Sequence, residues 1–142
     1  MPSLSRRELS CLLPFLSATA AGQPSPGKLS TKVYHPDQST GLAGQNKKGS
    51  RIFFGADHSG FQLEMHETVL GPGVESHPPH QHVHEEIIIV LEGTVETDVE
   101  GHTELAGPGA VIYFGSNQKH KSRNPGQVPS RYYVLELRGH ES

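Results

Sequence analysis

Cysteine is almost absent from this chain of 142 residues, and basic residues are few. The single cysteine, Cys11, cannot form an intramolecular disulfide, and the lack of a CxxC pair excludes a thiolate zinc site. Lys and Arg together number 12 against 15 Asp and Glu, and they form no cluster. This balance argues against electrostatic binding of nucleic acid.

Turn-forming residues and histidine, by contrast, are abundant. The 16 glycines and 11 prolines favour a domain with many turns, as in an all-β protein, over one built from long helices. The chain also contains 10 histidines, and histidine is the commonest metal ligand in proteins. The length suits one domain with a real core and is too short for two. We therefore expect a single β domain with a metal site.

The N-terminus resembles a bacterial twin-arginine signal peptide. Arg6 and Arg7 precede a short apolar stretch at residues 9–16, and Ala18-Thr19-Ala20 supplies an A-x-A cleavage pattern. The apolar stretch is too short to anchor the protein in a membrane. We therefore predict that residues 1–20 are a signal peptide and that the mature protein is periplasmic or extracellular. The alternative is a cytoplasmic protein whose Arg-Arg pair arises by chance.

The rest of the chain divides into an arm and a domain. Residues 21–50 are rich in Gly, Pro, Ser and Lys, which indicates an extended arm with at most one short strand around residues 32–35. Residues 51–140 form the domain, in which strand-like segments alternate with Gly-containing turns. These segments are "RIFFG", "FQLEMHETVL", "EEIIIVLEG", "TVETDVE", "AVIYF" and "RYYVLEL". Their short, regular spacing predicts a β-sandwich or barrel.

One stretch, "HPPHQHVHEEIIIVLEG", combines clustered histidines with a β-branched apolar run. Residues two apart on a strand project to the same face, so His80 and His82 point the same way. Glu86 keeps the same parity if the backbone stays extended. Two imidazoles and one carboxylate form most of the first shell of a divalent transition metal, and His120 on a neighbouring strand would add a fourth donor.

At these residues the chain resembles the cupin superfamily of small β-barrels, which carry two short motifs. The first motif, H-x-H-x3-E-x6-G, is matched by His80, His82, Glu86 and Gly93, with its leading glycine, Gly73, displaced by one position. The second is matched by Gly109, His120 and Asn124, with Gly115 in place of proline and Asn117 in place of glycine. Asn tolerates a positive φ better than other non-glycine residues, so Asn117 is expected to hold the same turn.

The resemblance implies an all-β fold, a single jelly-roll-like cupin barrel. It also implies that His80, His82, Glu86 and His120 bind one divalent transition metal, Fe, Mn, Ni or Zn, and leave positions open for substrate. The apolar run after Glu86 would then form the barrel wall. Among the ligands, Glu86 is the one most able to double as a catalytic proton acceptor.

Other histidines near the motif admit two interpretations each. His84 shares parity with the ligands, but the family turns the chain there, so we expect it to face solvent or to contact a ligand. His77 lies either at the mouth of the barrel or in a loop without a role. His66 either lines the pocket or is a hydrogen-bonded structural histidine, and we favour the structural role.

Two functions from different classes fit these features. The first is an enzyme that acts on a small molecule through one metal, by oxygenase chemistry or by Lewis-acid isomerase or decarboxylase chemistry. The second is a binding module that holds a metal or a small ligand without turnover. In either case we expect a small-molecule partner, no nucleic acid, no membrane in the mature form, and a homodimer in which the arm lies across the partner subunit.

Overall fold

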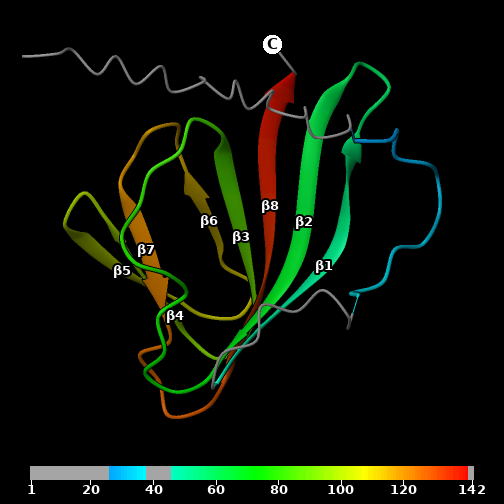
Figure 1. Ribbon diagram of the computed structural model, residues 1–142. Coiled ribbons are helices and arrows are strands. Elements are labelled where there is room, and N and C mark those ends of the chain that lie inside the picture. Colours follow the sequence, from blue (N-terminus) through cyan, green and yellow to red (C-terminus); the bar gives the residue numbers. More distant parts are fainter. Residues whose placement is uncertain (1–25, 38–45, 141–142) are drawn as a thin grey trace, which may run out of the picture.

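The computed structural model describes residues 26–37 and 46–140, and within them the chain forms eight β-strands (Figure 1). The strands are β1 (Lys47–Ala56), β2 (Phe61–Leu70), β3 (Glu85–Glu92), β4 (Val95–Val99), β5 (His102–Ala106), β6 (Val111–Phe114), β7 (His120–Arg123) and β8 (Ser130–His140). No helix long and apolar enough to cross a bilayer occurs in these two ranges. The all-β prediction is confirmed. The predicted signal peptide, residues 1–20, lies outside the described residues.

The strands form two antiparallel sheets of a jelly-roll sandwich. The larger sheet has the order β1-β2-β8-β3-β6, and the smaller has the order β5-β4-β7 (Figure 1). The long β2–β8 ladder runs from Phe61↔His140 to Leu70↔Ser130 and lies at the centre of the larger sheet. The loop between β2 and β3 runs beside β7, where Ser76 N donates to Ser122 O at 2.9 Å. This loop carries the first histidines of the motif.

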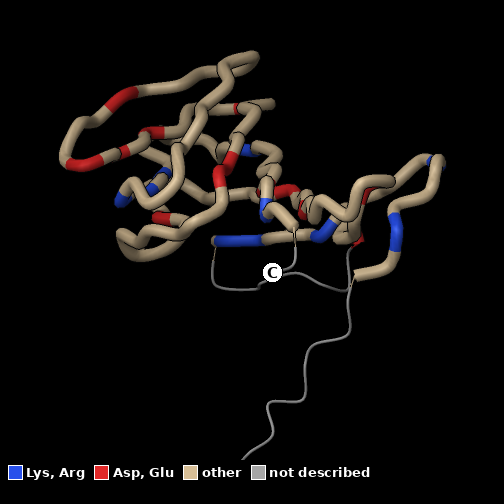
Figure 2. Tube along the Cα trace, turned by 90° about the horizontal axis from the view of Figure 1, so that it is seen from above, with Lys and Arg blue, Asp and Glu red and all other residues tan. Residues whose placement is uncertain are grey.

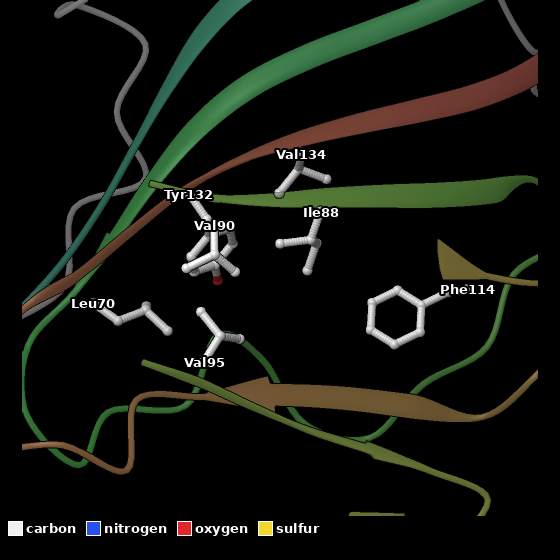
Figure 3. Packing of buried hydrophobic residues seen from close by; sticks show 7 residues of the cluster. All are labelled: Leu70, Ile88, Val90, Val95, Phe114, Tyr132 and Val134. Carbon is white, nitrogen blue, oxygen red and sulfur yellow. The ribbon is translucent and has the colours of Figure 1, made fainter. Parts of the chain in front are cut away.

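Seven buried side chains form the core between the sheets, as Figure 3 shows. They are Leu70, Ile88, Val90, Val95, Phe114, Tyr132 and Val134. In β3 the buried positions alternate with half-buried ones, so only one side of the "EEIIIVLE" run faces the core. The continuous apolar run from Ile87 to Leu91 alone would suggest a strand packed equally on both sides, but its other side is only partly covered.

The opposite face of the larger sheet is unusually apolar. Directly paired residues in antiparallel strands share a face, and one such row crosses all five strands. The row is Phe53, Met65, Leu135, Ile87 and Tyr113. The last of these, Tyr113, is 60% exposed. In β2, therefore, Met65 and the residues two apart from it lie on the outer face of the sheet. The alternate residues, which include His66, face the interior.

The described part of the arm lies along β1 of its own chain. Leu29 N donates to Ala56 O at 2.8 Å, and Ala56 N donates to Gly27 O at 3.1 Å. A Cβ on Gly55 would lie 2.7 Å from Gly27 O, so only glycine allows this close approach. Residues 32–35 form no strand. The arm therefore covers an edge of the larger sheet that would otherwise be open.

Candidate metal centre

His80, His82 and His120 lie together at one end of the sandwich interior. Each offers a ring nitrogen, and these three atoms lie within 4.8 Å of one another. Metal–ligand bonds of about 2.1 Å allow two ligand atoms to be up to about 4.2 Å apart, so a small inward shift closes the set around one ion. The prediction that His120 joins the two motif histidines in space is confirmed.

A backbone pairing brings these residues together. His80 N donates to His120 O at 3.0 Å and His120 N donates to His80 O at 2.8 Å, an antiparallel bridge between the β2–β3 loop and β7. Asn117 N donates to His82 O at 2.7 Å and holds the next part of the loop. Asn117 has φ +59°, as its place in the second motif predicts. The histidines are thus held by main-chain hydrogen bonds rather than by a free loop.

Two of the rings have a defined tautomer. His82 Nδ1 lies 2.7 Å from His84 O, and His120 Nδ1 lies 2.8 Å from Gln118 O. A carbonyl oxygen only accepts hydrogen bonds, so each Nδ1 carries the proton and each Nε2 keeps its lone pair. This is the usual arrangement of metal-binding histidines, whose second nitrogen donates to a carbonyl.

Whether these histidines suit a metal can be judged from their ring nitrogens that have no hydrogen-bond partner. Within the described ranges, His82 Nε2, His120 Nε2 and His80 Nδ1 are buried and have no hydrogen-bond partner. Buried polar atoms are rarely left unpaired, and three such atoms converging on one point are explained together by a cation. All three nitrogens are borderline-soft donors that suit a divalent transition metal. The residues therefore fit the ion that the sequence motif implies.

Ring packing supports the cluster from both sides. Phe114 stacks on His120 with ring centroids 4.1 Å apart, and His84 stacks on His82 at 3.8 Å. His77 packs edge-on against His80 at 4.0 Å. Burial lowers the pKa of His77 to about 4, with a smaller contribution from His80, so His77 is neutral at pH 7. His77 thus lies at the site.

Glu86 lies beside the cluster but is not part of the group of three. It is 6% exposed, and its Oε2 is 3.5 Å from His82 Nε2. Burial, the neighbouring charge of Glu136 and weaker opposing effects of His82 together raise the pKa of Glu86 from 4.5 to about 7. A carboxyl group buried in this way either takes up a proton, as the raised pKa indicates, or is held ionised by a nearby cation. Its role as the fourth ligand stays a prediction.

The raised pKa of Glu86 gives a testable pH dependence in metal-free protein. Between pH 4.5 and about 7 the native state binds more protons at Glu86 than the unfolded state does. The contribution of Glu86 to the free energy of unfolding is therefore fully present below pH 4.5 and is lost as pH rises through about 7.

Urea denaturation of chelator-treated wild type and Glu86→Gln across pH 4.5–8.5 measures this contribution. Because glutamine does not titrate, the difference isolates Glu86 from the histidines that also titrate in this range. We expect wild type to lose stability relative to the variant with rising pH, and a difference that rises instead would contradict the assignment.

Glu136 of β8 is a site residue that the sequence analysis missed. It pairs with Glu86 in the β3–β8 ladder and lines the same cavity. Its carboxylate contacts Arg138 Nη2 at 2.5 Å and His84 Nε2 at 3.4 Å. His84 is half-buried, and it contacts the expected ligand His82 through ring stacking and through its main-chain oxygen, in agreement with one of its two expected roles. The available signal was parity, because Glu136 shares a face with the buried Tyr132 and Val134.

The cavity next to the histidines has a volume of about 240 Å³. It extends from the metal cluster along the inner face of the larger sheet, and its lining includes His66, Thr68, Ser76, Tyr132 and Lys47. The side chain of Tyr132 is buried, and burial raises its pKa well above the usual value. His66 therefore lines the pocket, against the structural role we favoured from sequence.

Comparison with known proteins identifies relatives of this fold. Residues 66–136 match the family model Cupin_2, described as a cupin domain. A Cupin 2 conserved barrel domain protein from Salinispora arenicola is similar at 22% identity, with a TM-score of 0.61 over 77% of this chain and 90% of that one.

Two further solved structures share the fold at lower identity. KdgF from a Halomonas species is 16% identical, with a TM-score of 0.61 over 77% of this chain and 96% of that one. A sugar phosphate isomerase of the cupin superfamily from Silicibacter pomeroyi is 18% identical, with a TM-score of 0.56 over 75% and 69%. No curated protein sequence matches the chain. At these identities the structural matches show the fold alone.

Proposed function

The chain belongs to the cupin family, as its two motifs predicted, and from that premise we propose that it is a mononuclear metal enzyme that moves a proton on a small molecule. The observation that carries the proposal is the convergence of three buried, unpartnered histidine nitrogens beside two carboxylates. His80, His82 and His120, with Glu86 as the fourth donor, would hold one divalent ion, Fe, Mn, Ni or Zn.

The chain's own residues supply the parts of a proton-transfer site. When bound by these residues, a divalent ion would supply Lewis acidity, which would polarise a substrate carbonyl and make the neighbouring C–H group more acidic. Glu136 faces the cavity beside Glu86, and we assign it the role of proton acceptor, with Glu86 as its partner. Arg138 and His84 orient the Glu136 carboxylate. The core side chains Ile88 and Val134 limit access of water to it.

This assignment favours isomerase-type or decarboxylase-type chemistry over oxygenase chemistry. An oxygenase needs open metal positions but no ordered carboxylate beside them, whereas proton transfer needs a base within reach of the substrate. The similar sugar phosphate isomerase shows that the fold supports isomerisation in another protein. A non-catalytic module would not require a carboxylate beside the metal cluster, as Glu136 supplies.

Proton exchange tests the function even when the product of the reaction is unidentified. Metal-loaded protein is incubated in D2O with a panel of small 2-hydroxy and 2-oxo compounds and sugar phosphates, and loss of C–H signals is followed by NMR. We expect exchange in wild type and a loss of about 10²-fold or more in Glu136→Gln at unchanged metal content.

Glu85→Gln is the matched control, because Glu85 is the neighbouring β3 residue of opposite parity. It should exchange at the wild-type rate. Oxygen consumption with any member of the panel, in the absence of exchange, would favour the oxygenase instead. Exchange that persists in Glu136→Gln would remove that residue from the mechanism.

We also propose that the protein is exported and forms a homodimer. The twin-arginine pattern supports export. The half-buried apolar row across the outer face of the larger sheet supports pairing with a second copy, because such a row exposed in a monomer favours association. In Figure 2, Lys and Arg are interspersed with Asp and Glu along the trace, a mixture that gives no support to a nucleic-acid partner.

A further inference from the structure

Lys47 is the only Lys or Arg that lines the metal cavity in the part of the chain that the structure describes. It is the first residue of β1, and its backbone is held in place because the preceding Asn46 accepts a hydrogen bond from Gly71 N at 2.7 Å. Burial lowers the pKa of Lys47, and no ion pair joins it to a described residue. A partly buried ammonium group that lines a cavity and has no carboxylate partner is available to a ligand that carries negative charge.

Lys47 and two histidines of the metal cluster, His80 and His82, line the same cavity. The charge of Lys47 contributes, after burial, to the lowered pKa values of His66 on β2 and of His77 on the loop. His77 in turn packs against His80 of the metal cluster. Lys47 therefore lies within electrostatic reach of His77, which packs against the metal cluster.

The remaining polar groups of the cavity are suited to an oxygen-rich ligand. The hydroxyls of Thr68, Ser76 and Tyr132 lie on its wall. Of the two carboxylates in the lining, Glu136 is already paired with Arg138. A bound divalent ion and Lys47 would together exceed the charge of Glu86, so the cavity would carry a surplus of positive charge.

From this geometry we infer that the cavity takes a small anion that binds at two points, with oxygen donors at the metal and a terminal carboxylate or phosphate at Lys47. The inference rests on the proposed metal function and narrows it to anionic substrates. A cavity of about 150 Å³ holds benzene, so 240 Å³ allows about ten non-hydrogen atoms. The substrate class is thus a short hydroxy or oxo acid or a small sugar-derived phosphate, rather than a polymer.

Two chelators of matched shape isolate the role of the terminal anion. Succinate monohydroxamate and butyrohydroxamate bind a metal through the same group, but only the first has a terminal carboxylate. Titration of Co(II)-loaded protein, followed by the d–d absorption of the ion, measures both affinities without any assay of activity. We expect wild type to bind succinate monohydroxamate about tenfold more tightly, as for one charge-assisted hydrogen bond.

The variant Lys47→Met should lose this preference while it binds butyrohydroxamate and Co(II) as wild type does. Lys48→Met is the matched control, because Lys48 is exposed and lies next along β1, and it should keep the preference. A third probe with a terminal phosphonate in place of the carboxylate distinguishes the two sources of charge. Tighter binding of the phosphonate would assign a phosphate, and tighter binding of the carboxylate would assign an acid.

Two results would overturn the inference. Equal affinity of wild type for the two hydroxamates, with Co(II) bound, would remove the anion site and leave the metal function intact. A preference that persists in Lys47→Met would show that another group recognises the anion. Failure of the protein to bind Co(II) at all would instead refute the proposed function, and this inference with it.

Discussion

Replacing both His80 and His82 by alanine is expected to abolish metal binding without unfolding the protein. Structural zinc sites bind with about 10–16 kcal/mol, or on the order of 3 kcal/mol for each of four ligands. Loss of two imidazoles should therefore weaken binding by about four orders of magnitude. Both histidines are half-buried loop residues whose main-chain hydrogen bonds do not need the rings, so the fold should persist.

Plasma mass spectrometry of untagged protein purified without chelator measures this effect. Wild type should carry nearly one ion per chain and the double variant almost none, with unchanged circular dichroism. A His66→Ala/His102→Ala variant is the control, since His66 lines the cavity outside the group of three and His102 is exposed on β5. Retention of the ion in the His80/His82 variant would place the metal elsewhere. Failure of wild type to take up any ion on titration would refute the site.

Asn124→Ala is expected to cost about 3 kcal/mol of the free energy of unfolding. Asn124 is fully buried, and its Nδ2 donates to Leu70 O at 3.0 Å and to Val128 O at 2.8 Å. Its Oδ1 accepts from Gly126 N at 2.8 Å. Alanine leaves all three groups without this partner, and each buried unpaired group costs about 1–3 kcal/mol. The last residue of the second motif therefore has a structural role, joining the end of β2 to the β7–β8 turn.

Chemical denaturation of metal-free protein measures this cost separately from metal binding. Asn117→Gly is the matched control from the same motif, because Asn117 is exposed and its positive φ suits glycine. That variant should lie within about 1 kcal/mol of wild type. An Asn124→Ala variant that loses less than about 1 kcal/mol would contradict the structural role. A normal metal content in folded Asn124→Ala would agree with the absence of this side chain from the metal cluster.

The sequence was sufficient to predict the fold class and the three histidines that are positioned to hold a metal. Strand alternation and turn residues predict local structure well, because both depend on neighbours in the chain. The pairing of His80 with His120, by contrast, joins a loop to a strand 40 positions away. Only the family resemblance made that pairing predictable, since no local pattern encodes it.

Two charged residues of the cavity escaped prediction for different reasons. Glu136 is a charged residue in a strand, and such residues usually face solvent. Lys47 falls in the segment 21–50 that we interpreted as an arm, whereas it is the first residue of β1. Here the larger sheet has a polar inner face over the cavity and an apolar outer face, as the inward position of His66 and the outward position of Met65 show. Alternation alone divides a strand into two faces, but it does not tell which face is inside.

The main-chain bridge between the β2–β3 loop and β7 has a consequence for any ion held at the proposed site. An ion bound by His80 and His120 would join two segments that are also paired through their backbones, so the two imidazoles would stay close together after one of them let go. Rebinding would then compete with release, and the residence time of the ion would depend on how often the pairing opens as well as on ligand strength. Removal of such an ion by a chelator would therefore be slow, and faster under conditions that open the bridge.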